Sequence, residues 1–402
     1  MLPKGWKLLP FSEVAVVGSG QVDPKKEPYA SMIHIGPENI ESGTGRVISP
    51  QKCSELGLIS GKYEFDEEAL VYSKIRPHLN KVCFPGFKGV CSADAYPIWP
   101  DKSKLIPEYL KHYMLGSAFE KRAVVCSMRT GMPKINREDL DGIPLVVPPL
   151  PEQRRIANIL STWDQSIVTA ERLFANSQMQ LAALLQQLLI KPAIRGDWPT
   201  VAIGEISERV QRRADTEETL PVLMISSGSG FVRQDEKYSR FMAGKSVENY
   251  IALDRGEFAY NKGNSKLYEF GCIFPLYGYF RGLVPNVYVC FRLLENCNPG
   301  FYEHLFRADF LHDQLGALVN TGVRNNGLLN IRPADFLACE VPVPPLDEQQ
   351  RVAEILAAAT AWVEQHERGL DLLKQEKAAL MAKLLTGKRR VKLPTAETEA
   401  RA

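Results

Sequence analysis

The clearest pattern along the chain is a heptad repeat of apolar residues that occurs twice. Hydrophobic positions step alternately by four and three residues from Ile156 to Leu188, the spacing of a coiled-coil seam, and the same steps recur from Val352 to Leu384. Only Ser177, His366 and Lys377 place a polar side chain in either seam. The seam residues are Ile156, Leu160, Trp163, Ile167, Phe174, Leu181, Leu184 and Leu188, then Val352, Leu356, Val363, Leu370, Leu373, Leu380 and Leu384. The pattern predicts two long helices, 148–191 and 344–390, that pack against each other.

Proline, glycine and polar residues mark where these helices begin and end. Pro151 suits the first turn, because its missing N–H has no intrahelical partner there. Asp347 is predicted as the N-cap of the second helix, with Gln350 as its capping partner. Pro192 and Gly387 are predicted to close the first and the second helix.

The helix entrances belong to an internal repeat that covers the chain. The stretch 148–160 returns as 344–356, and nine of its thirteen positions are identical in a Pro-Pro-Leu-x-Glu-Gln pattern. Weaker sequence similarity relates Asp66–Lys74 to Asp254–Lys262, and the segment around Trp6 to the segment around Trp198. The chain is therefore predicted to be two copies of one module, related by a pseudo-twofold repeat.

The segments outside the helices, 1–147 and 192–343, are rich in short β-branched runs, aromatic residues, glycine and proline. This composition predicts mixed α/β domains, so the fold class is α/β (α+β), with a polar tail at 391–402. The pattern does not predict the order of the strands in a sheet. Candidate strands are Ala69–Ser73, Ala95–Trp99, Glu257–Tyr260, Cys272–Phe274 and Val287–Phe291.

Composition narrows the class of protein without identifying a function. The 402 residues include 49 Lys and Arg and 47 Asp and Glu. The resulting net charge of +2 does not by itself indicate a nucleic-acid-binding protein. The eight cysteines form no CxxC pair, which favours reduced thiols over a zinc site or a disulfide framework. A start without a signal-peptide pattern, and apolar runs too short to span a bilayer, predict a cytoplasmic protein with no membrane partner.

Motifs that carry catalysis or bind cofactors are not found. The sequence has no phosphate-binding GxxxxGK[ST] loop, no HExxH and no GxSxG, and Asp23 breaks the glycine pattern that begins at Gly18. The six histidines are scattered, with no neighbour that completes a metal or catalytic signature. We therefore expect no catalytic residue, no metal and no cofactor on this chain.

Local charge is less even than total charge, and it suggests where a polyanion could bind. Basic stretches recur at corresponding places in the two copies, and Lys, Arg and Asn on loops can contact phosphates and base edges. Such stretches are also common on ordinary solvated surfaces, and the sequence leaves both interpretations open. The candidate DNA contacts are Lys74, Arg76, Lys81, Arg129, Lys134, Arg137, Lys262, Lys266, Arg281, Arg324, Asn325 and Asn326.

The duplicated helix entrances, PPLPEQRRIANIL at 148–160 and PPLDEQQRVAEIL at 344–356, resemble the specificity subunits of type I restriction-modification systems. The resemblance covers the full order of variable segment, helix, variable segment, helix. It implies two target-recognition domains that each read one half of a bipartite, asymmetric site in double-stranded DNA, joined by an antiparallel coiled coil. It also implies two methyltransferase subunits and restriction (motor) subunits as partners. S-adenosylmethionine, ATP and Mg are then expected on those partners.

Three other functions remain open from the sequence. The chain could itself be a DNA methyltransferase or nuclease, although the motifs for that chemistry are not found. It could be a coiled-coil scaffold that joins proteins and never contacts DNA. It could also serve a related system whose partner fuses methyltransferase and nuclease. The layout of the repeat further predicts that the segment around Trp6 lies against the end of the second helix, which would bring the two termini near each other.

Overall fold

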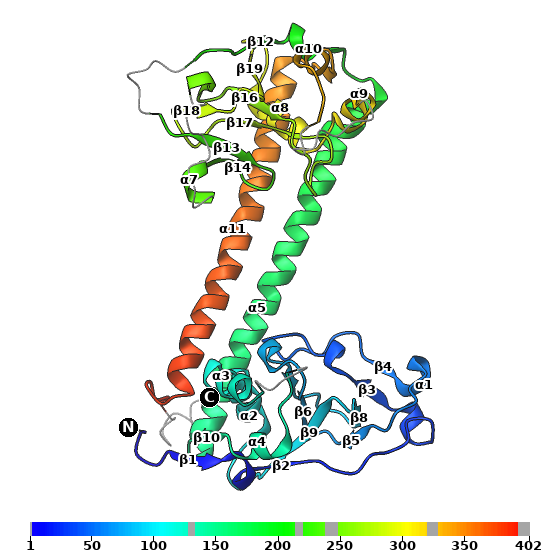
Figure 1. Cartoon of the computed structure of the whole chain (residues 1–402), viewed down its shortest axis with the longest axis vertical. Helices are drawn as coiled ribbons and strands as arrows, with labels where there is room; N and C mark the ends of the chain where they lie inside the picture. The colour runs from blue at the N-terminus through cyan, green and yellow to red at the C-terminus, as the bar shows by residue number, and fades with distance from the viewer. Residues whose placement is uncertain (1, 128–132, 214–219, 238–247, 320–328, 393–402) are drawn as a thin grey trace, which may run out of the picture. The chain divides into compact units, whose positions relative to one another are not determined.

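The computed structural model describes residues 2–127, 133–213, 220–237, 248–319 and 329–392, which form two compact units. Unit 1 contains Met1–Arg172 and Arg368–Ala402, and unit 2 contains Leu173–Glu367. The division passes through both long helices, so each unit combines one α/β segment with part of each helix (Figure 1).

The two long helices are α5, Leu150–Leu185, and α11, Leu346–Leu384. In unit 1 the first part of α5 pairs with the last part of α11. Asp164 forms an ion pair with Lys377, whereas Glu171, further along α5, pairs with Lys374, which comes earlier in α11. The helices are therefore antiparallel. In unit 2 the end of α5 packs near the start of α11, where Leu181, Leu184 and Leu188 lie against a core that includes Val352 and Leu356.

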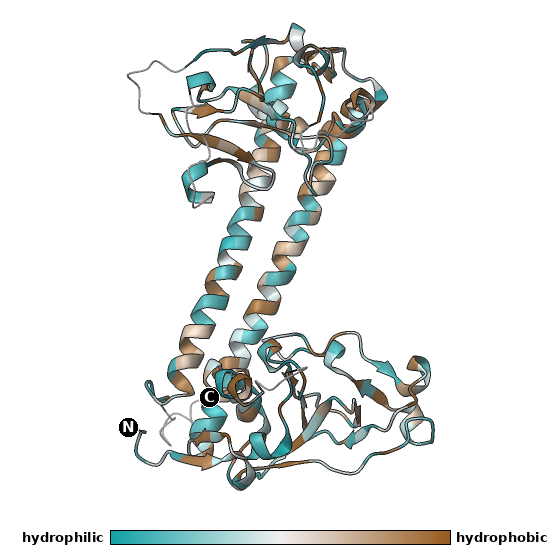
Figure 2. Cartoon of the chain, in the orientation of Figure 1, coloured by the Kyte–Doolittle hydropathy of each residue, from teal (hydrophilic) through white to brown (hydrophobic). Residues whose placement is uncertain are grey.

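The predicted seam residues are all buried or half-buried in the structure. Figure 2 shows apolar and polar residues interleaved along both helices, as expected for helices that bury one stripe. The polar seam residue Ser177 is 4% exposed, and its hydroxyl donates to the carbonyl of Phe174 at 2.8 Å. No helix among the described residues is long and apolar enough to cross a membrane.

The helix ends differ from the prediction at two places. Pro192 does not close the first helix: a π-helical turn, Gln186–Ile190, precedes it, and the helix continues as α6, Lys191–Arg195. The wider turn changes the i→i−4 ladder that a proline would otherwise break, and Gly196, with φ +72°, ends the helix. Asp347 is not an N-cap, because α11 already begins at Leu346. Pro151 does lie in the first turn of α5.

Unit 1 holds two four-stranded sheets and one two-stranded sheet. The first sheet has the order β2-β9-β6-β7, the second β4-β3-β8-β5, and β1 pairs with β10. Only the β3–β8 pair is parallel among the pairs described in this unit. The strands are β1 Lys7–Pro10, β2 Ala15–Val17, β3 Ile33–Ile35, β4 Gln51–Lys52, β5 Tyr63–Phe65, β6 Leu70–Ser73, β7 Val82–Cys83, β8 Gly89–Cys91, β9 Ala95–Pro100 and β10 Pro144–Val147. The helices are α1 Cys53–Leu56, α2 Pro107–Leu115, α3 Ser117–Ser127 and α4 Arg137–Asp141.

Unit 2 repeats the main sheet of unit 1. Its order β12-β19-β16-β17 corresponds to β2-β9-β6-β7, and the pair β11–β20 corresponds to β1–β10. Two further pairs are β13–β14 and β15–β18. The strands are β11 Thr200–Ala202, β12 Ser207–Arg209, β13 Leu223–Ser226, β14 Gly230–Arg233, β15 Ile251–Asp254, β16 Phe258–Asn261, β17 Cys272–Pro275, β18 Arg281–Val284, β19 Val289–Leu293 and β20 Glu340–Pro342. The helices are α7 Gln234–Lys237, α8 Pro299–Arg307, α9 His312–Leu318 and α10 Pro333–Leu337.

The predicted fold class, mixed α/β segments with two paired helices, is therefore confirmed. The five predicted strands all exist to within two residues, as β6, β9, β16, β17 and β19.

The Glu-Gln pair of the repeated motif attaches each helix to its α/β segment. Gln153 is fully buried; its side-chain oxygen accepts the N–H of Ile106 at 3.0 Å, and its amide donates to the carbonyl of Lys104 at 2.7 Å. Gln349 accepts the N–H of Asn298 at 2.8 Å in unit 2. Each side-chain amide hydrogen-bonds the backbone of a separate segment. These bonds fix the position of the start of each helix on its unit.

Tryptophan and glutamate complete both joints. The Trp6 indole donates to Glu152 at 3.1 Å, and the Trp198 indole donates to Glu348 at 3.1 Å. In unit 1 Arg390 also donates to Glu152, at 3.2 Å from its Nε. Trp6 thus lies against the end of α11, as predicted from the repeat.

The two glycines that follow the helix ends provide a matched pair of variants. Gly196 (φ +72°) has open space where a Cβ would be, whereas a Cβ at Gly387 (φ +74°) would lie 2.6 Å from the Pro3 ring. Gly196→Ala should lower the free energy of unfolding by about 1 kcal/mol through backbone strain alone. Gly387→Ala should cost more, because it also displaces the N-terminal segment. Urea denaturation of both variants measures the difference, and equal losses would contradict this packing.

Candidate nucleic-acid interface

The predicted basic residues of unit 1 come from two segments that lie side by side. Lys74 and Arg76 follow β6, and Ile75 forms an isolated β-bridge with Lys134. The N–H of Arg76 donates to the carbonyl of Pro133 at 2.8 Å, and the N–H of Ile135 donates to the carbonyl of Lys74 at 2.9 Å. The structure therefore brings together candidates that are sixty residues apart in sequence.

Arg76 and Lys134 are exposed on these two segments. Arg76 has a left-handed backbone (φ 49°), an uncommon conformation for a residue with a Cβ, and its backbone bond to Pro133 maintains it. Such residues are found more often at functional sites than elsewhere. Two exposed cations on adjoining segments can contact phosphates or base edges.

Lys74 and Arg137 have internal roles instead. The Lys74 ammonium lies 5.0 Å from the centre of the Tyr96 ring, and the Arg137 guanidinium lies 5.1 Å from the same centre. Lys74 is 8% exposed, and burial, assisted by the positive charges of Lys134 and Arg137, lowers the pKa of its amine. Arg137 donates to the carbonyls of Val17, at 2.8 Å, and Gly18. The amine of Lys74 is therefore enclosed by the protein in this structure, and its contact with DNA stays a prediction.

Lys81 also uses its charged group inside the protein, where its amine donates to the carbonyl of Pro37 at 2.6 Å. Arg129, Arg324, Asn325 and Asn326 were predicted as DNA contacts and lie outside the described residues.

Unit 2 repeats the local geometry around Lys262. The N–H of Leu329 donates to the carbonyl of Lys262 at 3.0 Å, much as Ile135 does to Lys74 in unit 1. Lys266 is exposed on the loop that follows, and Ser265 and Tyr268 close this loop through a backbone bond of 3.0 Å. Arg281 forms an ion pair with Asp254 at 2.5 Å. Corresponding edges of the two units therefore present exposed cations close to β6 and β16.

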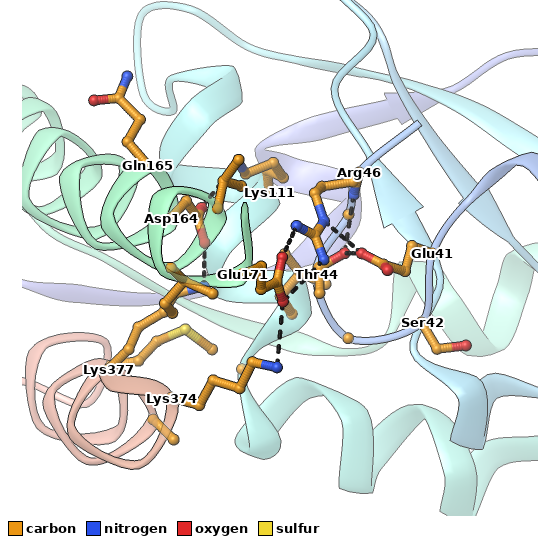
Figure 3. A pocket seen from close by; sticks show the side chains of 18 of the residues that line it. Glu41, Ser42, Thr44, Arg46, Lys111, Asp164, Gln165, Glu171, Lys374 and Lys377 are labelled. Atoms are coloured by element: carbon orange, nitrogen blue, oxygen red, sulfur yellow. Dashed lines mark hydrogen bonds and ion pairs between the residues drawn. The ribbon is translucent and has the colours of Figure 1, made fainter. Parts of the chain in front are cut away.

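A cavity of about 840 Å³ lies in unit 1 between the loop at Glu41–Arg46, α2, α3, α5 and α11. Figure 3 shows Asp164 between two lysines: its carboxylate pairs with Lys111 at 3.6 Å and with Lys377. Glu171 likewise pairs with Lys374 at 3.2 Å and with Arg46. These pairs connect the α/β segment to both helices, so the charged groups of the cavity stabilise unit 1. Among the described residues, no group of three His, Cys, Asp or Glu could hold a metal ion.

Two histidines at equivalent positions of the repeat were not recognised from the sequence. His112 in α2 and His304 in α8 are 0% and 8% exposed, and each follows a proline-initiated helix start by five residues. Burial lowers the pKa of His112 well below its usual value and lowers that of His304 to about 4. Aligning Pro107 with Pro299 would have paired them, which favours a core role over an isolated functional one.

These two histidines should make the protein sensitive to acid. Their folded-state pKa values lie below that of an unfolded histidine, so the unfolded chain binds more protons as the pH falls from about 6.5 toward 4. Each histidine should then reduce the free energy of unfolding by up to about 1.4 kcal/mol per pH unit. His112→Gln with His304→Gln should flatten the pH dependence measured by urea midpoints, whereas His78→Gln, at an exposed position, is the control.

Comparisons with known proteins point to one family. The pattern of the family described as "Type I restriction modification DNA specificity domain" matches residues 3–173. The EcoDI type I restriction enzyme specificity subunit of Escherichia coli is 38% identical over 196 residues, which cover 49% of this chain and 43% of that protein. The EcoKI specificity subunit of Escherichia coli is 23% identical and covers 96% of this chain and 89% of that protein.

Solved structures share the fold. The HsdS subunit of Thermoanaerobacter tengcongensis aligns with a TM-score of 0.52 and 18% identity, covering 96% of this chain and 98% of that one. The type I restriction-modification S subunit of M. genitalium aligns with a TM-score of 0.59 and 13% identity, covering 94% of this chain and 96% of that one. At this identity the likeness concerns the fold alone.

Proposed function

We propose that this chain, which is similar to type I restriction-modification specificity subunits, selects the DNA sequence on which a type I complex acts. Units 1 and 2 would each read one half of a bipartite site in double-stranded DNA. The observation that carries this proposal is the repetition of one sheet order, β2-β9-β6-β7 and β12-β19-β16-β17, with exposed cations at corresponding edges.

The antiparallel helices support a fixed separation between the two halves of the site. A rigid pair of helices would set the distance between the two reading surfaces, and half-sites on one face of B-DNA are about one helical turn, roughly 34 Å, apart. The repeat places Asn264 of unit 2 where unit 1 has Arg76, and this difference supports two different half-sites and therefore an asymmetric recognition sequence.

Catalysis is proposed to reside on the partner subunits. Two methyltransferase subunits would bind S-adenosylmethionine and modify the site, and restriction subunits would use ATP and Mg. The carboxylates that line the cavity of unit 1 support this division, because Asp164 and Glu171 are both engaged in ion pairs with lysines. The specificity subunit of a system with a fused methyltransferase-nuclease partner would use the same surfaces.

An exchange of one α/β segment tests whether the two units recognise their half-sites independently. Replacing residues 197–343 by the corresponding segment of another specificity subunit should change one half of the methylated sequence and leave the other half and the gap unchanged. Methylation mapping of DNA from cells that express the chain with its methyltransferase partner measures both. Methylation that does not depend on this chain would favour a scaffold that never contacts DNA.

Arg76 and Lys134 provide a test of the surface in unit 1. Arg76→Gln and Lys134→Gln should weaken DNA binding by the assembled methyltransferase complex, and each removed phosphate contact should reduce the slope of log affinity against log salt by about one. Lys52→Gln is the matched control, because Lys52 is also exposed but lies on the other four-stranded sheet. An unchanged slope in both variants would remove these residues from the interface.

A further inference from the structure

The loop between β17 and β18 of unit 2 exposes aromatic rings. Phe280 is 84% exposed and Tyr277 is 42% exposed. Single exposed apolar residues are common on protein surfaces, but a nearly fully solvated phenylalanine on a loop with a second partly exposed ring is available to a partner.

The internal repeat shows that exposure is particular to unit 2. Phe87-Lys88-Gly89 precedes β8 in unit 1, and Phe280-Arg281-Gly282 occupies the same place at the start of β18. Phe87 is half-buried and packs with its ring centre 6.0 Å from that of Phe65. The ring that completes a core in unit 1 is therefore turned to solvent in unit 2.

The backbone that carries Phe280 is fixed on both sides. Its carbonyl accepts the N–H of Arg255 at 2.9 Å, and the next residue, Arg281, pairs with Asp254 across the β15–β18 ladder. Gly282 packs so closely that a Cβ there would lie 2.3 Å from Leu223. An aromatic ring held in this way loses little conformational freedom when it binds.

The surroundings of Phe280 are rich in arginine. Asp254 is shared by Arg281 and by Arg212, at 2.8 Å, and Arg212 also pairs with the buried carboxylate of Glu257. Arg255, which directly follows β15 beside Phe280, is exposed, and so is Arg213, which bridges Ile251 at the other end of the strand. Arg212 and Arg281 are thus balanced by Asp254 and Glu257, and the exposed Arg255 adds a positive charge next to Phe280.

The corresponding place in unit 1 is not basic. Lys88, the counterpart of Arg281, pairs with Glu64 at 3.0 Å, and Glu67 stands where the repeat places Arg255. The aromatic ring and its arginines are therefore a feature of one unit, as expected for a residue that contributes to only one half-site.

We propose that Phe280 inserts between two base steps of the half-site bound by unit 2 and stacks on a base that the insertion partly unstacks, while Arg255 contacts a flanking phosphate. This inference rests on the proposed function and adds to it a contact that the basic stretches did not indicate. Double-stranded DNA is the occupant that the observations favour, because a polyanion with aromatic faces matches both the positive charge and the exposed ring.

The test uses the assembled complex of this chain with its methyltransferase partner and a duplex that carries the methylated sequence. Phe280→Ala should weaken binding roughly tenfold to a hundredfold, the range for loss of one base–aromatic stack. The slope against log salt should stay unchanged, whereas Arg255→Gln should reduce that slope by about one. Phe280→Trp should retain binding, because it keeps an aromatic ring.

A fluorescent base analogue locates the contact. 2-Aminopurine is placed at each position of the half-site in turn, and one position should gain fluorescence on binding, because the inserted ring separates that base from its neighbour; Phe280→Ala should abolish the gain. Ile194→Ala is the matched control, since Ile194 is 75% exposed in the same unit and should leave affinity unchanged.

Three results would overturn the proposal. Wild-type affinity of Phe280→Ala would exclude stacking. Failure of Phe280→Ala to assemble with the methyltransferase partner in size-exclusion chromatography would assign the ring to a protein contact. A wild-type complex that binds all duplexes equally would overturn the proposed function itself, and the contact with it; the first two results leave the proposed function standing.

Discussion

The attachment of each long helix to its α/β segment is the constraint on which the rest of the structure depends. Gln153 and Gln349 are fully buried, and each hydrogen-bonds backbone groups of a segment about fifty residues away. Loss of one such amide would leave several buried backbone groups without a partner, which costs more than an ordinary hydrogen bond contributes. The direction in which each helix leaves its unit is therefore set by a polar joint, and apolar packing along the seam then holds the helices together.

The two joints have the same chemistry and different connections. In unit 2, Trp198 follows the end of the first helix through Gly196 and reaches Glu348 at the start of the second. In unit 1, Trp6 reaches Glu152 in the same way, but the end of α11 meets this joint through contacts of Gly387 and Arg390. In unit 2 the chain runs directly from the end of the first helix to the tryptophan, whereas in unit 1 the segment after α11 only packs against it. The two joints therefore have the same arrangement despite the different connection.

Several cations in the basic stretches and the helix seam are used inside the protein. Lys74 and Arg137 flank Tyr96, Arg281 neutralises Asp254, and Lys377 neutralises Asp164. Counting basic residues in a stretch therefore overestimates the cations that a duplex can meet. The exposed Arg76 and Lys134 lie where two distant segments adjoin, and Phe280 adds an exposed aromatic ring that a count of charges does not detect.

The sequence by itself determined the duplicated architecture, the two long helices and the apolar seam along each of them. Heptad spacing and a dense repeat can be read directly from the chain. It also located the principal strands. It did not determine the sheet order, since strand pairing joins residues far apart, nor that a π-helical turn carries the helix through Pro192. Tertiary structure alone decided that Lys74 is enclosed, that His112 and His304 are buried equivalents, and that Phe280 faces solvent while Phe87 does not. The burial of a side chain depends on which surfaces pack together in the folded protein, and the residue type alone does not determine that.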